Sequence, residues 1–409
     1  MQAKAYIVSF PVDFKLSRFR IIYSHHVVIT IESEGVTAIG SGILYRSSGA
    51  TVIGLWHEWL KATLGNLTKD AWQVSWQSLI KRIIPTEPGL AFALDTAFWD
   101  LKGQQEQHSL VDLLGGVVHN PLAVTEQIFI ADWEQSEREL AEIVSRGTTK
   151  LKVKTGFSPA EDIQLIRKVR QFVGNDVEIR VDANRAYSLS ESRALYKAMA
   201  DLGVLAVEEP LNNRADLGRF RREIGLPVML DESVLTTADL EEAIASEAID
   251  SLNIKLTRVG GISEAMTYQR RCEAAGVAVS LGCNEDLGPG MAAILHLAAA
   301  SPDLYSMEGI GRLRLNIDFI AEDMVIQHGS VWLPDGNGLG VHLADDFPDG
   351  LKQYAHIFDL STTSPWLIKG ASHFFRNKQR AATAVYRLQR QFMRQNKWSR
   401  HREEIDVKQ

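Results

Sequence analysis

Short apolar runs, many of them ending in a charged residue, alternate with amphipathic stretches of helical length over residues 117–345. This alternation predicts strands that each lead into a crossover helix, as in the βαβ units of a parallel sheet. Eight such units in about 200 residues predict an α/β fold, a TIM-type (β/α)7β barrel. The helical pattern over 190–202 is expected to begin with Ser190 as its N-cap. The predicted strands are 122–130, 150–155, 178–182, 205–208, 228–231, 251–255, 278–282 and 304–308.

The chain before this barrel has a different pattern. Residues 3–46 contain apolar or alternating runs punctuated by glycine, which predicts antiparallel strands. Residues 51–114 follow helical spacing and are expected to serve packing. We therefore predict an α+β capping domain at 1–116, the barrel at 117–345 and a C-terminal segment at 346–409.

The composition of the chain argues against several classes of protein. The chain has 409 residues, of which 45% are hydrophobic, enough for a large core and two domains. A formal net charge of −7 argues against nucleic-acid binding by the core. Only Cys272 and Cys283 are present, the N-terminus lacks a signal-peptide pattern, and no apolar run approaches membrane-spanning length. We expect a cytoplasmic protein that acts on a small molecule or a partner.

Three predicted strands end in acids, Asp182, Glu208 and Asp231, spaced about 25 residues apart, the length of one strand and its crossover helix. Because parallel strands place their carboxyl ends on one face of a barrel, the three carboxylates should converge. Crowded carboxylates repel one another unless a cation lies between them. Oxygen ligands suit a hard cation, so we predict Mg²⁺, with Mn²⁺ as the alternative. Each acid alone would equally suit a helix cap or a solvated loop.

Lysines lie on both sides of these acids. Lys152 and Lys154 are two residues apart on one predicted strand, so both side chains should face the barrel interior. Lys255 ends a strand on the opposite wall. Buried cations near one another and near a divalent metal have lowered pKa values, which makes a neutral lysine available as a base. Two bases on opposite faces of an α-carbon predict racemisation or epimerisation, although a lone strand-end lysine is more often a surface ion-pair partner.

Taken in order, these segments resemble the enolase superfamily, and specifically its muconate lactonizing enzyme subgroup, over about residues 5–345. The subgroup includes dipeptide epimerases, N-succinylamino acid racemases and o-succinylbenzoate synthases. The resemblance rests on the helix ALDTAFWDLKG at 93–103, Lys-x-Lys at 152–154, DAN at 182–184, EEP at 208–210, DES at 231–233, and NIKL at 253–256 before the glycines 260 and 261.

The resemblance implies a role for each strand-end residue. Asp182, Glu208 and Asp231 match the Mg²⁺ ligands, and Glu209 stands where the subgroup often has Gln. Lys154 matches the base on one face and Lys255 the base on the other. Lys152 matches the residue that tunes Lys154 and touches the substrate carboxylate. The metal would bind that carboxylate and stabilise the enediolate formed on proton loss.

Two departures from the subgroup bear on the substrate. After the seventh strand the usual Cys-Met-x-Glu is replaced by Cys-Asn-Glu-Asp, which puts Asp286 at the glutamate's position. After the eighth strand, dipeptide epimerases carry Asp-x-Asp to hold the substrate ammonium, whereas residues 316–318 read Asn-Ile-Asp. Half of that pair is absent, which weakens the prediction of a free-amine dipeptide, but Asp318 remains a candidate ammonium ligand.

Basic residues are candidates for contact with a second substrate carboxylate. Arg20 and His25 lie in the predicted connection between the first two strands, which would be either a cationic lip over the site or a solvated loop. Arg258 follows the Lys255 strand. The seventh strand ends without the histidine of mandelate racemase-like members, which favours the two-lysine subgroup.

The sequence thus predicts an Mg²⁺-dependent racemase or epimerase of an amino-acid derivative or dipeptide. A cycloisomerase or an o-succinylbenzoate synthase-type lyase would use the same residues. Residues 369–409 are strongly basic and carry one apolar helical face at 381–393, which suggests contact with an acidic surface, a membrane interface or the chain's own body, or a disordered tail. A non-catalytic scaffold acting through this tail is the other alternative. The partners expected are a small carboxylate substrate and a second copy of the chain.

Overall fold

The computed structural model describes residues 1–360 except 16–19, 45–48, 68–71, 129–132, 310, 312–314, 316 and 354. The basic segment at 369–409 therefore lies outside the described residues. Within the described ranges, no helix is both long and apolar enough to cross a membrane. The cytoplasmic location and the self-association stay predictions.

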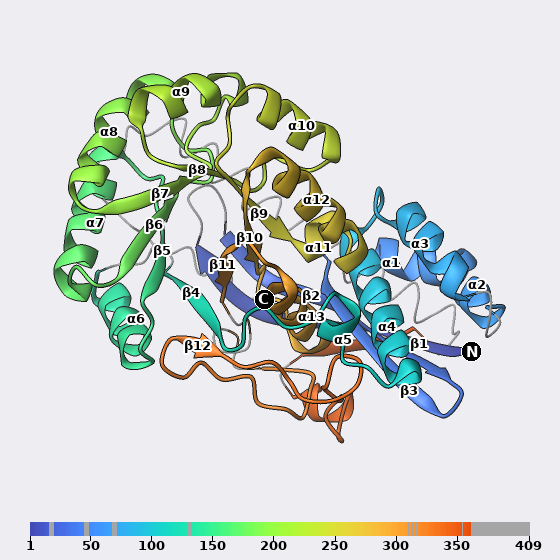
Figure 1. Ribbon diagram of the computed structural model, residues 1–409. Helices are drawn as coiled ribbons and strands as arrows, with labels where there is room; N and C mark the ends of the chain where they lie inside the picture. The colour runs from blue at the N-terminus through green and yellow to red at the C-terminus, as the bar shows by residue number, and fades with distance from the viewer. Residues whose placement is uncertain are drawn as a thin grey trace.

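Eight parallel strands form a closed barrel surrounded by helices (Figure 1), which confirms the predicted fold class. The strands follow one another in chain order around the barrel, and β11 pairs with β4 to close it. Each strand lies where the sequence places it, with small differences at the ends. They are β4 (Leu122–Ile128), β5 (Lys150–Lys154), β6 (Glu178–Asp182), β7 (Val204–Glu208), β8 (Val228–Leu230), β9 (Ser251–Lys255), β10 (Ala278–Gly282) and β11 (Leu304–Glu308).

The helices between these strands cover the outside of the barrel in Figure 1. Helix α8 begins after Ser188, so the prediction of Ser190 as its N-cap is wrong. Ser188 is preferred because Glu191 stands three residues later and completes a capping box, in which each side chain bonds the other's backbone N–H. The helices are α6 (Trp133–Ser145), α7 (Pro159–Val173), α8 (Leu189–Asp201), α9 (Leu217–Ile224), α10 (Thr237–Ala245), α11 (Leu256–Val259), α12 (Ile262–Ala275) and α13 (Gly288–Ala300).

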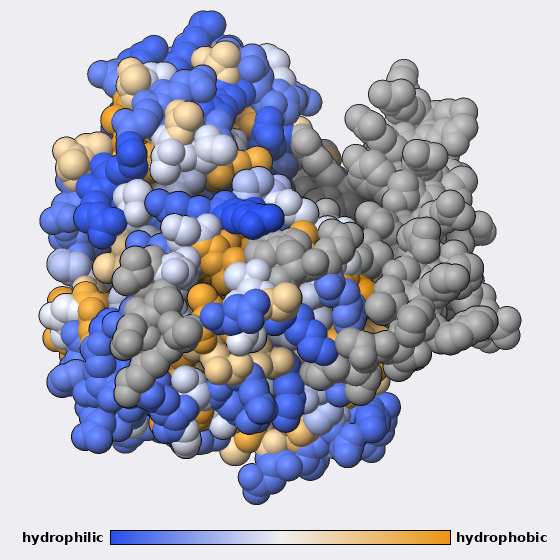
Figure 2. Space-filling view, turned by 90° about the vertical axis from the view of Figure 1, so that its right-hand side faces the viewer, coloured by the Kyte–Doolittle hydropathy of each residue, from blue (hydrophilic) through white to orange (hydrophobic). Residues whose placement is uncertain are grey.

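The N-terminal part is an antiparallel sheet with helices on one side. The sheet consists of β1 (Gln2–Lys15), β2 (Arg20–Ser33), β3 (Val36–Ile43) and the late strand β13 (His356–Asp359), in the order β13-β1-β2-β3. Part of the segment after residue 346 thus returns to this sheet, and the domain boundaries stay predictions. The helices are α1 (Gly49–Leu55), α2 (Lys61–Gly65), α3 (Trp72–Ile83), α4 (Pro88–Glu106) and α5 (Leu110–Leu113), with a π-helix at Trp56–Leu60. Figure 2 shows the side of the molecule that carries this part as mostly hydrophilic, with small apolar areas between.

The capping sheet covers the carboxyl ends of the barrel strands. Val8, Phe10 and Val28 of β1 and β2 pack with Leu287 and Phe319, which follow β10 and β11 in the chain. Because these barrel residues lie beyond the strand ends, the strands of the cap close that end of the barrel. In Figure 1 the blue strands accordingly pass behind the barrel.

Helix α4 joins the cap to the barrel through two buried acids. Asp95 accepts hydrogen bonds from the backbone N–H (2.9 Å) and the hydroxyl (2.8 Å) of Ser263 in α12. Asp100 accepts from the backbone N–H groups of Ile39 (2.8 Å) and Leu339 (2.9 Å). The helix expected to serve packing therefore also fixes the position of the barrel segment that follows Lys255.

Candidate active site

The predicted lysines and acids meet at the carboxyl end of the barrel, under the cap. Because β5 and β9 are four positions apart in the strand order, Lys154 and Lys255 extend from opposite walls. The end of the barrel is thus lined by ionisable groups that water hardly reaches. The six residues are at most 7% exposed, and they are Lys152, Lys154, Asp182, Glu208, Asp231 and Lys255.

Each of the two opposed lysines pairs with a predicted metal ligand. Lys154 Nζ lies 2.5 Å from Asp182 Oδ2 and 3.2 Å from Asn184 Oδ1. Lys255 Nζ lies 2.9 Å from Asp231 Oδ2. The structure thus places an ammonium group beside an acid on each wall.

Glu308, at the end of β11, is an acid of this site that the sequence analysis missed. Its Oε1 lies 2.5 Å from Lys152 Nζ and 2.5 Å from an Arg180 guanidinium nitrogen. Asn253 Nδ2 donates to both Glu308 Oε1 and Glu208 Oε1, each at 3.0 Å. The signal was present, because Glu308 is the charged last residue of a predicted strand, as are Asp182 and Glu208.

The three predicted metal ligands are carboxylates, which are suitable ligands for a hard divalent cation. In this structure their oxygens form ion pairs with lysine and arginine side chains. In the described part of the chain, no three His, Cys, Asp or Glu side chains are arranged as a metal cluster. Lys152 Nζ nevertheless lies 3.5 Å from Glu208 Oε2 and 4.0 Å from Asp182 Oδ2, so a single ammonium group lies close to both acids. Among the described residues, Glu208 Oε2 is buried and has no hydrogen-bond partner, although Arg180 Nε lies 3.3 Å from it. A buried carboxylate oxygen without a donor is suited to a metal ion.

The pKa values of the two opposed lysines are raised, which contradicts the expectation that they are lowered. Burial by itself lowers the pKa of Lys154, but Asp182 and Glu208 outweigh burial and raise it. Burial likewise lowers the pKa of Lys255, and Asp231 outweighs it. The expectation assumed that a divalent cation, and not the lysines, neutralises the carboxylates.

Two of the predicted ligands, Glu208 and Asp231, differ in how readily they ionise. Burial raises the pKa of Glu208 to about 7, with Lys152 opposing the shift. Burial also acts to raise the pKa of Asp231, but the neighbouring Arg258 and Lys255 hold it below its usual range. Of these two acids, Asp231 is therefore the one more firmly held as an anion.

The predicted substrate ligands on the barrel side lie in different surroundings. The guanidinium of Arg258 donates to Asp231, so it faces a predicted metal ligand. Asp286 is 2% exposed, and its Oδ1 has no hydrogen-bond partner within the part of the chain that the structure describes. Burial raises the pKa of Asp286 to about 6. Asp318 is half-buried and accepts from the N–H of Phe319 at 2.7 Å, whereas residue 316 lies outside the described residues. Their contacts with a substrate stay predictions.

The predicted ligands on the cap side are only partly described. The side chain of Arg20 lies outside the described part of the chain. His25 belongs to β2, not to a connection between strands, and its Nδ1 lies 2.8 Å from Ser9 Oγ. The next residue, His26, faces the barrel, where its ring stacks on Phe10 and meets the edge of Phe319. Burial lowers the pKa of His26 to about 3, so its ring is neutral.

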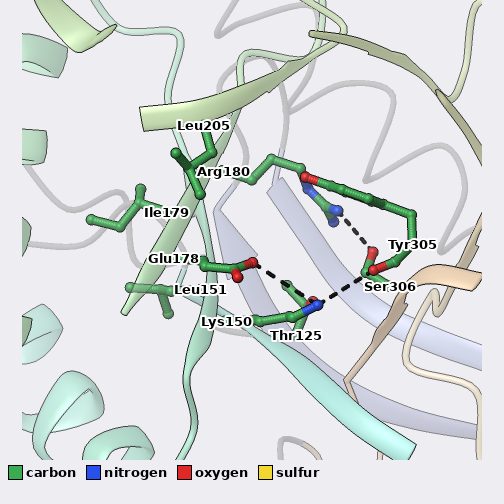
Figure 3. Close-up of a pocket in the computed structure, with 9 residues that line it drawn as sticks. All are labelled: Thr125, Lys150, Leu151, Glu178, Ile179, Arg180, Leu205, Tyr305 and Ser306. Carbon is green, nitrogen blue, oxygen red and sulfur yellow. Dashed lines mark hydrogen bonds and ion pairs between the residues drawn. The ribbon is translucent and has the colours of Figure 1, made fainter. Parts of the chain in front are cut away.

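A separate small pocket opens at the amino ends of the strands (Figure 3). Lys150 Nζ lies there 3.9 Å from Glu178 Oε2 and 3.4 Å from the Tyr305 carbonyl. Arg180 points from its wall toward Ser306 and donates to the Ser306 hydroxyl at 3.0 Å. Because the same guanidinium reaches Glu308, Arg180 separates this pocket from the lysines.

Comparisons with known proteins identify the family of the chain. The family described as Enolase C-terminal domain-like matches residues 135–347, and the Mandelate racemase / muconate lactonizing enzyme N-terminal domain matches residues 3–115. Chloromuconate cycloisomerase CbnB of Cupriavidus necator is 30% identical over 335 residues, which cover 78% of this chain and 90% of that protein. The N-succinyl-L-Arg/Lys racemase of Bacillus cereus is 26% identical over 329 residues, which cover 78% of this chain and 88% of the racemase.

Solved structures share the architecture. The dipeptide epimerase from Cytophaga hutchinsonii, complexed with Mg and the dipeptide D-Ala-L-Val, superposes with a TM-score of 0.78 at 23% identity. The superposition covers 88% of this chain and 100% of the epimerase. At this identity the likeness supports the fold alone.

Proposed function

Because this chain belongs to the enolase superfamily, in its muconate lactonizing enzyme subgroup, and is an isomerase, we propose that it racemises or epimerises the α-carbon of a carboxylate substrate. The substrate would be an amino-acid derivative or a dipeptide. The observation that carries the proposal is the placement of Lys154 and Lys255 on opposite walls of the barrel, both buried and each beside a carboxylate.

The two lysines would act as a pair of bases. In one direction, the neutral amine of Lys154 takes the proton from one face of the α-carbon, and the C–H electron pair moves into the substrate carboxylate. The ammonium of Lys255 then gives a proton to the opposite face, and the electron pair returns to carbon. The reverse direction exchanges the two roles. Proton and charge balance in each direction, and no co-reactant is needed.

Charge on the substrate carboxylate would be balanced by fixed groups. Asp182, Glu208 and Asp231 would hold Mg²⁺, which supplies positive charge to the substrate carboxylate. Lys152 is 1% exposed and held by Glu308 at 2.5 Å, so its ammonium is a fixed positive charge. We expect this ammonium to donate to the substrate carboxylate as negative charge develops there.

Two carboxylate oxygens near the ends of β10 and β11 accept no hydrogen bond from the described residues, which favours a substrate with N–H groups. Asp286 Oδ1 and Glu308 Oε2 are buried and have no hydrogen-bond partner in the described residues. Buried acceptors without donors are costly, so a substrate amine or amide would be favoured there. A hydrocarbon dicarboxylate such as a muconate offers only acceptors.

Cycloisomerisation is the second candidate, because a chloromuconate cycloisomerase is 30% identical over most of its length. It needs one lysine as a proton donor or acceptor, with the other lysine kept as a cation. Action through the basic segment at 369–409 stays a separate prediction.

The proposal is tested by α-proton exchange in D₂O with Mg²⁺, followed by mass spectrometry and chiral analysis over L,L-dipeptides and N-succinyl amino acids. We expect exchange with inversion in the wild type and loss of inversion in K154A and in K255A. K150A is the matched control, since Lys150 lies at the opposite end of β5 and pairs with Glu178. Full inversion in either variant of the opposed lysines contradicts the proposal. Wild type that exchanges none of these compounds but converts a muconate favours cycloisomerisation.

A further inference from the structure

Asp231 differs from the other two predicted metal ligands in its backbone support. Asp182 and Glu208 lie within the barrel sheet and pair with each other in the ladder between β6 and β7. Asp231 lies one residue beyond β8, which has only three residues, and its ladder contacts with β9 end at Leu230. The sheet therefore leaves the backbone of Asp231 without a strand pairing, although a metal ligand must be held in place.

The side chain of Glu209 supplies this support. Its Oε1 accepts hydrogen bonds from the backbone N–H groups of Asp231 and Ser233, each at 2.7 Å. Its Oε2 accepts from the hydroxyl of Ser233 at 2.5 Å. One fully buried carboxylate thus binds both ends of the three-residue loop that starts with Asp231.

The backbone of Glu209 is turned so that this contact is possible. Its φ is +44°, in the left-handed region that side chains other than glycine rarely adopt. In a regular strand, consecutive side chains point to opposite faces, so Glu209 would point away from the site when Glu208 points inward. The turn at Glu209 instead directs its carboxylate along the strand end toward the loop after β8. A strained residue with a fully hydrogen-bonded buried acid is typical of a functional site.

We propose that Glu209 is a positioning residue that fixes the backbone of Asp231, so that its carboxylate stays with those of Asp182 and Glu208 as one divalent-cation site. This inference rests on the proposed function, because it takes Asp231 as a metal ligand. Glutamine is the conservative replacement, since its Oε1 can accept from both N–H groups while its amide nitrogen donates to the Ser233 hydroxyl. Alanine removes all three hydrogen bonds.

The test measures Mg²⁺ binding to the full chain by calorimetry, together with thermal unfolding in EDTA. We expect the Mg²⁺ Kd of E209A to rise by about 10-fold or more and that of E209Q to stay within about 3-fold of wild type. D100A is the matched control, because Asp100 is also a buried acid that accepts two backbone N–H groups. It should lower the unfolding temperature without changing the Kd.

An unchanged Kd in E209A overturns the inference, as does an E209Q variant that binds as weakly as E209A while unfolding like wild type. If E209A does not fold, S233A replaces it, with an expected rise in Kd of about 3-fold and an unchanged Kd as the opposing result. Wild type that binds no Mg²⁺ contradicts the proposed metal site itself. Equally tight Mg²⁺ binding by wild type and E209A contradicts only the positioning role.

Discussion

Lys152 of β5 and Glu308 of β11 form an ion pair inside the barrel, with Nζ and Oε1 2.5 Å apart and both side chains at most 1% exposed. Burial acts to raise the pKa of Glu308, but Lys152 and Arg180 outweigh it and lower the pKa to about 2. Glu308 is thus an anion at any pH at which the protein would work. It fixes the position of the lysine proposed to touch the substrate.

Glu308→Gln is expected to reduce turnover and also to lower stability, because it removes an anion from between two buried cations. Glu208 Oε2 also lies 3.5 Å from Lys152 Nζ and 3.3 Å from Arg180 Nε, so the amide removes one of two negative charges that these cations share. The lysine is then less well fixed, and kcat should fall by about 10- to 100-fold. The measurement is kcat and KM on the substrate identified by α-proton exchange. Glu126→Gln is the control, since Glu126 is a buried acid paired with Arg146 away from the lysines. Turnover in E308Q equal to that of E126Q would show that the pair has no part in the reaction.

Because Gly282 has no side chain, the side chain of Lys255 can lie directly beside its backbone. A Cβ atom at Gly282 would come within 2.8 Å of Lys255 Cγ and 2.4 Å of Asn253 Oδ1. Gly282→Ala is therefore expected to displace Lys255 and reduce inversion by about 100-fold, because small misplacements of a reacting group are costly. Deuterium exchange from the substrate enantiomer that faces Lys154 should persist.

The control for this substitution is Gly65→Ala, because a Cβ at Gly65 meets nothing within 4 Å. Circular dichroism and thermal unfolding check that both variants fold. Equal loss of exchange from both enantiomers in G282A would argue against a specific effect on Lys255.

Much of the fold can be predicted from the local pattern of apolar and polar residues, whereas the site can be predicted from that pattern only in part. Strands that end in Asp182 or Lys255 are readable because parallel strands and their helices repeat at a near-constant spacing. The hydrogen-bond and ion-pair partners of buried side chains cannot be predicted from sequence spacing in this way. The contact between Arg258 and Asp231 was not predicted, since only the packed barrel decides which carboxylate lies within reach of the guanidinium. The left-handed backbone of Glu209 has no sequence signal either, because such conformations are imposed by tertiary contacts.

Asp95, one of the two buried acids of α4 that link the cap to the barrel, makes the free energy of unfolding depend on pH. Burial raises the pKa of Asp95 to about 7, above its usual value of 3.8. The folded state therefore binds a proton more tightly than the unfolded state, so this group stabilises the fold most at low pH. Its contribution is lost as the pH rises from about 4 to about 7, by at most about 4 kcal/mol, at about 1.4 kcal/mol per pKa unit.

Asp95→Asn isolates this contribution. The free energy of unfolding in urea is measured for wild type and D95N at several values between pH 4 and pH 8. We expect the stability of wild type relative to D95N to fall across this window and to level off above about pH 7, since asparagine does not titrate. A difference that does not change with pH would mean that Asp95 ionises normally in the folded protein.

Two buried cations, Lys255 and Arg258, pair with Asp231. Lys255 Nζ lies 2.9 Å from Asp231 Oδ2, and the Arg258 guanidinium donates to Oδ1. Asp231→Asn should abolish Mg²⁺ binding and also destabilise the metal-free protein by about 3–5 kcal/mol, because it leaves two buried cations without a shared anion. Adding Arg258→Met to D231N should restore part of that stability, since it removes one of the two unpaired charges.

The measurement for this prediction is urea unfolding in EDTA for the wild type, both single variants and the double variant, which forms a double-mutant cycle. Glu134→Gln is the control, because its pair with Arg138 is exposed, and such pairs contribute at most about 1 kcal/mol. If D231N is as stable as the wild type without metal, Asp231 does not hold these cations. The ion pairs would then not be what keeps the metal-free site in order.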